Sequence, residues 1–258
     1  MQAYALTDPA ILSLLKQQAA AGLDVTLFYD PSACDDLSST LRPYGIQAYP
    51  VQCSGLMHRK ILIIDGQQLF FGSANFTTSS LKMHGNLLLG LYDPALANAI
   101  ASDQGHQNFF LLPDSKEAAL ASLLRALDGA KEQILISLFT FTHPLLIDAL
   151  VAAHQRGIVV NIAMDYYSGK GASALAVQRL REAGIAVRLS RGPQLLHDKW
   201  ALIDESTLIL GSANWTEAAF SANQDCLAIL EKIGPKERRS LKKMWKSVAA
   251  SCDMQGAL

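Results

Sequence analysis

The chain has 258 residues, of which 50% are hydrophobic and 17% are charged, and its formal net charge is −1. This composition excludes a disordered chain, and the near-neutral charge excludes a general positive field that would attract polyanions without specific contacts. The sequence contains no apolar run of about 18 residues, so we predict no transmembrane helix.

The N-terminal residues predict the end of a strand, a helix and a second strand. The β-branched run GLDVTLFYD at residues 22–30 follows an apolar helical pattern that ends at its Gly. The segment has no basic leader and does not resemble a secretion signal. As the sequence stands, we expect a cytoplasmic protein.

The segment HRKILIIDGQQLFFGSAN at residues 58–75 recurs without a gap as HDKWALIDESTLILGSAN at residues 197–214. Upstream, GLDVTLFYD matches GIVVNIAMD at residues 157–165, and LTDPAILSLL matches FTHPLLIDAL. Strands that alternate with helices indicate α/β layers. The chain is therefore predicted to be an internal duplication, two α-β-α sandwich halves related by a pseudo-twofold axis.

The two halves differ at their starts. Between about residues 102 and 115, Gly, Asn, Asp and Pro cluster, and Asp114 or Ser115 can cap a helix that precedes a strand at residues 133–139. We predict a first half at 1–101, a linker at 102–115 and a second half at 116–258. The first half has no room for the opening helix, so we expect the gene product to start earlier, with an export signal as one option. The alternative is that the first half tolerates an incomplete sheet.

Both repeated segments follow the pattern HxKx4Dx6GSxN. Residues two apart in a strand share a face, so the imidazole and the ammonium of each copy are predicted to project together. Glycine lets the backbone approach a ligand, and asparagine supplies amide donors. A donor-rich, cationic group of this kind suits a phosphate oxyanion. The candidate residues are His58, Lys60, Gly72, Ser73 and Asn75 in the first copy, and His197, Lys199, Gly211, Ser212 and Asn214 in the second.

This motif and its duplication resemble the HKD signature of the phospholipase D superfamily, at every signature position and over nearly the whole chain. The resemblance implies a phosphodiesterase without metal or cofactor, in which two motifs meet at one site. One His attacks phosphorus to form a phosphohistidine, and the other protonates the leaving oxygen. Water, or an alcohol, then releases the product.

The two histidines need different surroundings, because a nucleophile must be unprotonated and an acid protonated at the same pH. Counting 28 residues on from each His reaches Asn86 in the first copy and Asp225 in the second. A carboxylate raises the pKa of an imidazole more than an amide does. We therefore predict His58 as the nucleophile, oriented by Asn86, and His197 as the general acid, held protonated by Asp225.

The remaining polar candidates are predicted to be structural. Asp65 and Asp204 lie at strand ends, where we expect them to hold the scaffold. The other histidines, which we expect at the surface or around the site, are His84, His106, His143 and His154. The four cysteines have no CxxC spacing, and we predict no metal site and no disulfide framework from them.

The motif does not distinguish a phospholipid substrate from a nucleic acid, and the compact form of the chain resembles the nuclease and cardiolipin-hydrolase branch of the superfamily. We favour phospholipid, with an apolar rim and a basic C-terminal helix, KERRSLKKMWK, that contacts anionic membranes. The rim candidates are Phe70, Phe71, Phe76, Trp215 and Phe220.

Two alternatives stay open. A metal-independent endonuclease acting on DNA or RNA would need basic residues that bind the phosphates of the nucleic acid. The candidates precede the second motif and are Arg179, Arg181, Arg188 and Arg191. A noncatalytic phosphate-binding scaffold is the second alternative. Because the second motif is internal, we expect a monomer that contains its own pseudo-dimer.

Overall fold

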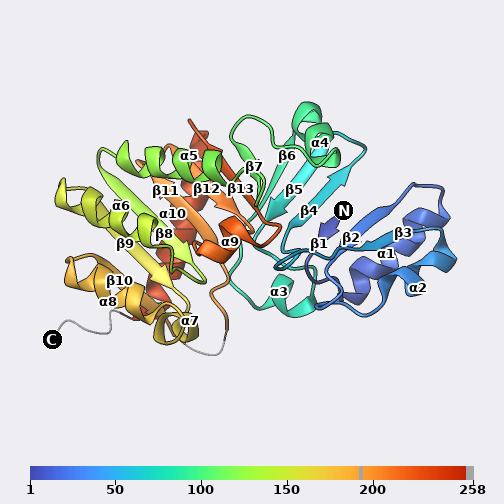
Figure 1. Cartoon of the computed structure of the whole chain (residues 1–258), viewed down its shortest axis with the longest axis horizontal. Helices are drawn as coiled ribbons and strands as arrows, with labels where there is room; N and C mark the ends of the chain where they lie inside the picture. The colour runs from blue at the N-terminus through green and yellow to red at the C-terminus, as the bar shows by residue number, and fades with distance from the viewer. Residues whose placement is uncertain (192–193, 254–258) are drawn as a thin grey trace.

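The computed structural model describes residues 1–191 and 194–253, and Figure 1 shows two β-sheets side by side with helices around them. The first half contains β1 (Gln2–Ala3), α1 (Pro9–Ala20), β2 (Thr26–Tyr29), α2 (Leu37–Leu41), the 3-10 helix η1 (Arg42–Tyr44), β3 (Gln47–Pro50), β4 (Lys60–Ile64), β5 (Gln68–Gly72), α3 (Thr78–Lys82), β6 (Leu88–Tyr92) and α4 (Pro94–Ala101).

The second half repeats this order with additions. It contains β7 (Phe109–Leu111), α5 (Lys116–Asp128), β8 (Gln133–Leu138), α6 (Pro144–Gln155), β9 (Val159–Met164), α7 (Tyr166–Lys170), α8 (Ala174–Glu182), β10 (Ala186–Ser190), β11 (Lys199–Ile203), β12 (Thr207–Gly211), α9 (Glu217–Ser221), β13 (Cys226–Leu230), α10 (Pro235–Ala250) and β14 (Cys252–Asp253).

The strand orders of the two sheets show the duplication directly. The first sheet has the order β3-β2-β1-β4-β5-β6, and the second has β14-β10-β9-β8-β11-β12-β13-β7. Three strands at one side of each sheet are parallel, β1 to β3 and β8 to β10, and the next three pair antiparallel. The predicted duplicated α/β fold is confirmed.

Local sequence explains where the equivalent helices begin and end. Asp8 caps α1 by accepting from the backbone of Ala10 and Ile11, and Pro9 follows at the first helical position. After α1 and after α6, Gly22 and Gly157 take φ values of 97° and 91°, which a residue with a side chain rarely adopts. The chain therefore turns into β2 and β9 at the same point of each repeat.

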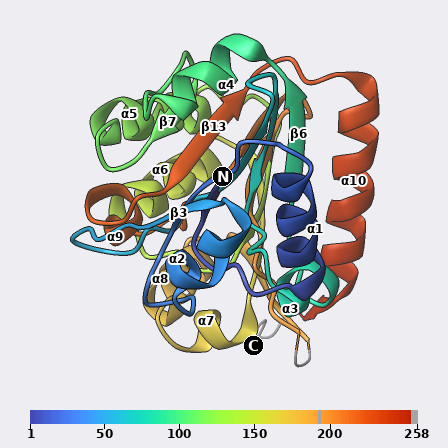
Figure 2. The same cartoon turned by 90° about the vertical axis from the view of Figure 1, so that its right-hand side faces the viewer.

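The hydrophobic core lies in layers. One cluster fills the space between the second sheet and α5, α6 and α8, and another joins both sheets with α10. Figure 2 shows α1 and α10 on one side of the sheets and α5, α6 and α9 on the other. Ile61 and Phe71 of the first sheet belong to the same cluster as Trp200 and Leu210 of the second, so the halves share one apolar interface.

The first half lacks a counterpart of α5 among the described residues, as predicted. In the second half, the sheet face next to α5 buries Ile209, Leu227 and Ile229. The equivalent positions of the first half are Phe70, Leu88 and Gly90, and Leu88 is exposed. The Phe70 ring lies over Gly90, where an added Cβ would be 2.7 Å from the ring. An aromatic ring thus covers part of the sheet that a helix covers in the other half.

The segment predicted as a linker has structure of its own. Strand β7 lies inside residues 102–115 and pairs antiparallel with β13, at the edge of the second sheet. The segment is also attached to the first half, because the buried Arg59 donates to Asp103 and to the carbonyl oxygen of Leu112. The turn-forming residues around β7 had led to the prediction of a linker, although a short apolar strand lies between them.

The contacts between the halves are reciprocal, as expected for a twofold axis. Met57 pairs with Gln224, and the equivalent Leu196 pairs with Gly85. The amide of His58 donates to Gln224 over 2.8 Å, and the amide of His197 donates to Gly85 over the same distance. The pseudo-twofold axis therefore passes between the two motifs.

A stability comparison tests the close strand approach at the end of the motif. A Cβ at Gly211 would lie 2.1 Å from the carbonyl oxygen of Cys226, whereas a Cβ at Gly22 would meet nothing within 4 Å. We expect Gly211→Ala to lower the free energy of unfolding by about 3 kcal/mol and Gly22→Ala by about 1 kcal/mol. Urea denaturation measures both, and equal small losses would contradict the steric explanation.

Candidate active site

Both motif histidines lie at the boundary between the halves, just before β4 and β11. Each is nearly buried, with 6% of His58 and 8% of His197 exposed. The backbone ahead of each His is held by an aspartate at the end of a neighbouring parallel strand. Asp30 accepts from the amide of Met57 over 2.8 Å, and Asp165 accepts from the amide of Leu196 over 3.2 Å.

The imidazoles take their partners from the opposite halves. His58 Nδ1 lies 2.8 Å from Asp225 Oδ1, and His197 Nδ1 lies 3.1 Å from Asn86 Oδ1. The predicted pairs, His58 with Asn86 and His197 with Asp225, are therefore wrong. The spacing of 28 residues found the right side chains, but the twofold axis exchanges them between the halves.

The serines of the motif bind the partners of the imidazoles, and the glycines allow a close approach of the next strand. Ser73 Oγ donates to Asn86 Oδ1 over 2.9 Å, and Ser212 Oγ donates to Asp225 Oδ1 over 2.6 Å. Gly72 and Gly211 are needed for a different reason, because a Cβ on either would lie 2.1 Å from a carbonyl oxygen of the next strand. These contacts give the four residues a structural role, and phosphate binding by them stays a prediction.

The motif lysines are buried beside the histidines. Lys60 Nζ donates to the carbonyl oxygen of His58 over 2.5 Å, and Lys199 Nζ donates to that of His197 over 3.0 Å. Burial lowers the pKa of Lys60 to about 7, and burial and the nearby Lys60 lower the pKa of Lys199 well below its usual range. Two ammonium groups so poorly solvated favour an anion between them.

An aromatic ring lies under each histidine and lysine. Tyr4 contacts His58 edge to face, with ring centroids 5.0 Å apart, and Lys60 Nζ lies 4.9 Å from the Tyr4 centroid. Phe139, at the equivalent position, lies 5.0 Å from the His197 ring and 5.2 Å from Lys199 Nζ. Sequence reasoning missed this pair, although the alignment that matches Pro9 with a later Pro also matches Tyr4 with Phe139.

The histidines and Asp225 form a coupled set of charges. Burial and Lys60 lower the pKa of His58, while Asp225 opposes this shift. Burial and both lysines lower the pKa of His197, and the charge of His58 adds to this effect. Burial would raise the pKa of Asp225, but His58 and Lys60 outweigh it, so Asp225 stays ionised. The imidazoles are therefore close enough to affect each other's protonation.

The asparagines of the motif complete the cluster. In both halves the side-chain Oδ1 atom, of Asn75 and of Asn214, is buried without a hydrogen-bond partner among the described residues. Because buried polar groups are almost always paired, a matched pair of open groups indicates a place for a polar ligand.

The two motif aspartates lie away from this cluster, in the turns after β4 and β11. Asp65 and Asp204 both have positive φ values, and Asp204 accepts from the backbone amides of Lys131, Glu132 and Gln133. This contact holds the end of β11 to the start of β8, the scaffold role predicted for Asp204.

The predicted aromatic rim is mostly core. Phe71, Phe76, Trp215 and Phe220 are each no more than 6% exposed, and Phe70 packs over Gly90. Phe71 lies in β5 and Phe220 in α9, whereas Phe76 and Trp215 form isolated bridges outside the named strands. The apolar pattern had therefore marked packing and not a lipid contact.

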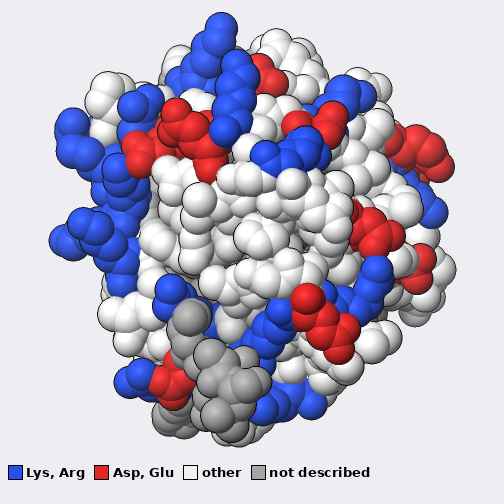
Figure 3. Space-filling view, turned by 90° about the vertical axis from the view of Figure 1, so that its left-hand side faces the viewer, with Lys and Arg blue, Asp and Glu red and all other residues white. Residues whose placement is uncertain are grey.

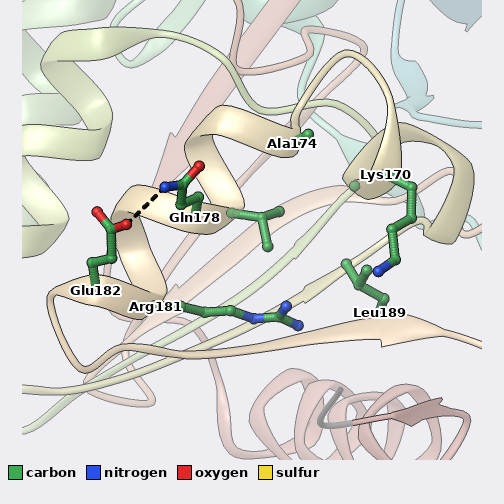
Figure 4. Close-up of a pocket in the computed structure, with 8 residues that line it drawn as sticks. Lys170, Ala174, Gln178, Arg181, Glu182 and Leu189 are labelled. Atoms are coloured by element: carbon green, nitrogen blue, oxygen red, sulfur yellow. Dashed lines mark hydrogen bonds between the residues drawn. The ribbon is translucent and has the colours of Figure 1, made fainter. Parts of the chain in front are cut away.

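The predicted arginine track is divided among separate contacts. Arg179 pairs with Asp148, and Arg191 pairs with Asp253. Arg181 donates to the carbonyl oxygen of Val187 and lines a cavity of about 320 Å³ between α8 and β10, where its side chain and Lys170 extend over the same space (Figure 4). The lining of this cavity includes no residue of either motif.

Among the other histidines, only His84 packs near a motif ring. Its ring centroid lies 6.5 Å from that of His197. His154 Nδ1 contacts the carbonyl oxygen of Ile158, and His143 is the N-cap residue of α6. Across residues 1–191 and 194–253, no three His, Cys, Asp or Glu side chains are grouped in a way that could hold a metal ion.

A duplicated α/β fold with two HxK segments that exchange partners across a twofold axis defines a two-motif HKD protein. The family model described as "Cardiolipin synthase, PLD-like domain" matches residues 1–105 and 123–245. The chain belongs to this family, within the phospholipase D superfamily.

The relatives match the chain over different lengths. Mitochondrial cardiolipin hydrolase of Homo sapiens is 40% identical over 116 residues, which is 45% of this chain and 45% of the relative. The chain thus spans about half the length of the curated relatives it matches.

Among solved structures, Nuc of Salmonella typhimurium, a phospholipase D family member, is 30% identical with a TM-score of 0.53, over 56% of this chain and 94% of that chain. Phosphatidylserine synthase of Haemophilus influenzae, at 12% identity and a TM-score of 0.76, shares the fold over 97% of this chain and 80% of that chain.

The lysine pair predicts a pH-dependent affinity for a simple anion. Sulfate keeps its charge between pH 6 and 9, and its binding needs protonated Lys60, whose pKa is lowered to about 7. Affinity should be full below pH 7 and fall as pH rises above it, toward about tenfold per unit. Calorimetric titrations across this range measure it, and Lys60→Gln should have a weaker affinity and a shallower slope, because only Lys199 then titrates. A wild-type affinity that is constant with pH would contradict the assignment.

Proposed function

We propose that the chain is a metal-independent phosphodiesterase that works through a phosphohistidine on His58. The observation that carries this proposal is the crossed pair of hydrogen bonds, which joins the buried imidazole of each half to a side chain of the other half, with a buried lysine beside each imidazole. A phosphodiester has one negative charge, and this cluster supplies cationic and amide donors for its nonbridging oxygens.

The first step assigns attack to His58. Its Nδ1 is bound to Asp225, so Nε2 carries the lone pair that forms the N–P bond. The phosphorylated ring is cationic, and the carboxylate of Asp225 stabilises this charge as it develops. If His197 attacked, the same charge would develop beside the neutral amide of Asn86. The nucleophile therefore stays as predicted, with a carboxylate and not an amide as its partner.

His197 acts as the general acid in this step. Asn86 accepts from Nδ1, which leaves the Nε2 proton of the imidazolium to be transferred to the leaving oxygen as the P–O bond breaks. The surroundings lower the pKa of His197, and the charge of a bound phosphodiester acts in the opposite direction. In the second step His197 takes a proton from water, which attacks phosphorus and releases His58.

We propose a phospholipid as the substrate. The loops and the short helices α3 and α7 near the motif histidines carry apolar side chains that remain exposed, unlike the aromatic residues that the sequence suggested. They are Leu56, Leu81, Met83, Tyr166 and Tyr167. The relatives named mitochondrial cardiolipin hydrolase support the same substrate class.

Helix α10 supports a peripheral membrane contact. It carries six Lys or Arg residues and one Glu over Pro235–Ala250, and buries Leu241 toward the sheet. Figure 3 shows Lys and Arg side chains gathered along the left edge of the view, where α10 lies. Basic amphipathic helices bind anionic lipid surfaces. No helix among the described residues is long and apolar enough to cross a bilayer.

An endonuclease is the second candidate, and one observation favours it. Tyr166 and Tyr167 lie side by side and exposed, with ring centroids 5.5 Å apart, and exposed aromatic rings can stack on unpaired bases. We also propose that the chain acts as a monomer, because each motif finds its partner within the chain.

Turnover in EDTA tests the proposed function. Purified protein should cleave labelled cardiolipin or phosphatidylcholine vesicles at the same rate with and without EDTA, and His58→Ala should lower that rate by at least about a thousandfold. Cleavage of plasmid DNA alone would select the nuclease. Cleavage of neither substrate, nor of bis(4-nitrophenyl) phosphate, would favour a noncatalytic scaffold.

A trapping experiment tests the roles of the histidines. In His197→Asn, bis(4-nitrophenyl) phosphate should release one equivalent of nitrophenol in a burst, because this leaving group needs no acid. Hydrolysis of the phosphoenzyme should then stall, and mass spectrometry should locate the phosphoryl group on residue 58. The assignment would be reversed if the matched His58→Asn variant carried a phosphoryl group on His197 and the His197→Asn variant carried none on His58.

A further inference from the structure

The loops of the two halves meet beside each motif histidine, at two places that the twofold axis relates. We call these two places the entrances, and their structures differ. On the His58 side, Asn223 Oδ1 accepts from the amide of Leu56 over 3.0 Å, and Ser54 Oγ donates to the carbonyl oxygen of Ala222 over 3.2 Å. Gly55 permits this contact, since a Cβ there would lie 2.4 Å from Asn223 Oδ1. The loops of the two halves are thus joined on this side.

On the His197 side, both residues that close the first entrance are replaced. Gln194 occupies the position of Gly55, and His84 occupies that of Asn223. A side chain at 194 prevents the close contact made at Gly55, and no side-chain hydrogen bond of His84 is found among the described residues. A cavity of about 360 Å³ is present instead. Its lining includes Lys82, His84, Arg191, Gln194 and Leu196.

This entrance is basic where the other is neutral. The described residues that line it include Lys82, His84 and Arg191 and no carboxylate. Arg191 pairs with Asp253, and Lys82 lies near enough to Asp8 to lower its pKa, so two carboxylates partly offset the charge from outside the lining. The twofold counterpart of Lys82 is Ser221, which carries no charge. The asymmetry therefore adds cationic donors on the side of the general acid only.

We propose that this entrance, which we call the His84 pocket after its lining, binds a second phosphate carried by the leaving alcohol, with Lys82 and His84 as its ligands. This inference rests on the proposed function, because the leaving group departs toward His197. The His84 ring lies 6.5 Å from the His197 ring, so a group bound there is next to the oxygen that receives the proton. The preferred substrates are then diesters whose leaving alcohol is itself phosphorylated.

A matched pair of lipids tests the pocket. Phosphatidylglycerol and phosphatidylglycerol phosphate differ only in a phosphate on the departing glycerol. We expect the full chain to have a kcat/KM about tenfold higher for the phosphorylated lipid in mixed micelles. His84→Asn with Lys82→Ser, which installs the residues of the neutral entrance, should bring this ratio close to one. Lys131→Ser, at the opposite end of the second sheet, is the control that keeps the wild-type ratio.

The outcomes separate this inference from the proposed function. A ratio near one in the wild type, or a ratio that the double variant leaves unchanged, would overturn the pocket while hydrolysis of bis(4-nitrophenyl) phosphate still supports the phosphodiesterase. A second arm compares kcat/KM for a thymidine dinucleotide with and without a terminal phosphate on the nucleoside that leaves. A phosphate preference that Lys82→Ser removes in either arm supports the pocket, and the arm that shows it tells whether the phosphate belongs to a lipid or a nucleotide.

Discussion

The structure depends on hydrogen bonds that cross from each half to the other. His58 with Asp225 and His197 with Asn86 are buried contacts between segments that are 167 and 111 residues apart in the chain. Each imidazole has its orientation fixed only when the halves are joined, so neither half contains a complete site. The shared apolar cluster between the sheets holds this arrangement, because it packs Phe71 of β5 against β12 of the other sheet.

The site is nearly symmetric, and its chemistry arises from the positions where the symmetry fails. Both halves supply a histidine, a lysine, an asparagine and an aromatic ring in equivalent places. The partner of the imidazole is a carboxylate on one side and an amide on the other, which gives the rings different capacities to carry charge. The loop residues at His84 and Asn223 differ too, so a cavity with a basic lining lies on one side and a hydrogen-bonded loop contact on the other. Under the proposed mechanism, these differences give the reaction its direction.

The sequence was sufficient for the fold class and for the histidines, lysines and asparagines of the cluster, because a spacing repeated without a gap shows which residues are equivalent. It did not reveal the aromatic rings of Tyr4 and Phe139. It could not show that the twofold axis exchanges Asn86 and Asp225, since a count along the chain finds equivalent residues and not neighbours in space. The same limit applies to Gly72 and Ser73, whose roles depend on the next strand. The sequence also does not show whether an apolar side chain such as Phe71 or Trp215 lies in the core or at the rim of the site.

The central claim is that the carboxylate at 225 belongs to His58 and not to the histidine of its own half. The NMR signals of the Nδ1 protons, resolved in protein labelled with 15N-histidine, measure this most directly. Asp225→Asn should shift the Nδ1 proton of His58 strongly and that of His197 little, and Asn86→Asp should shift His197. The account is contradicted if substitution at 225 moves the signal of His197 and leaves that of His58 in place.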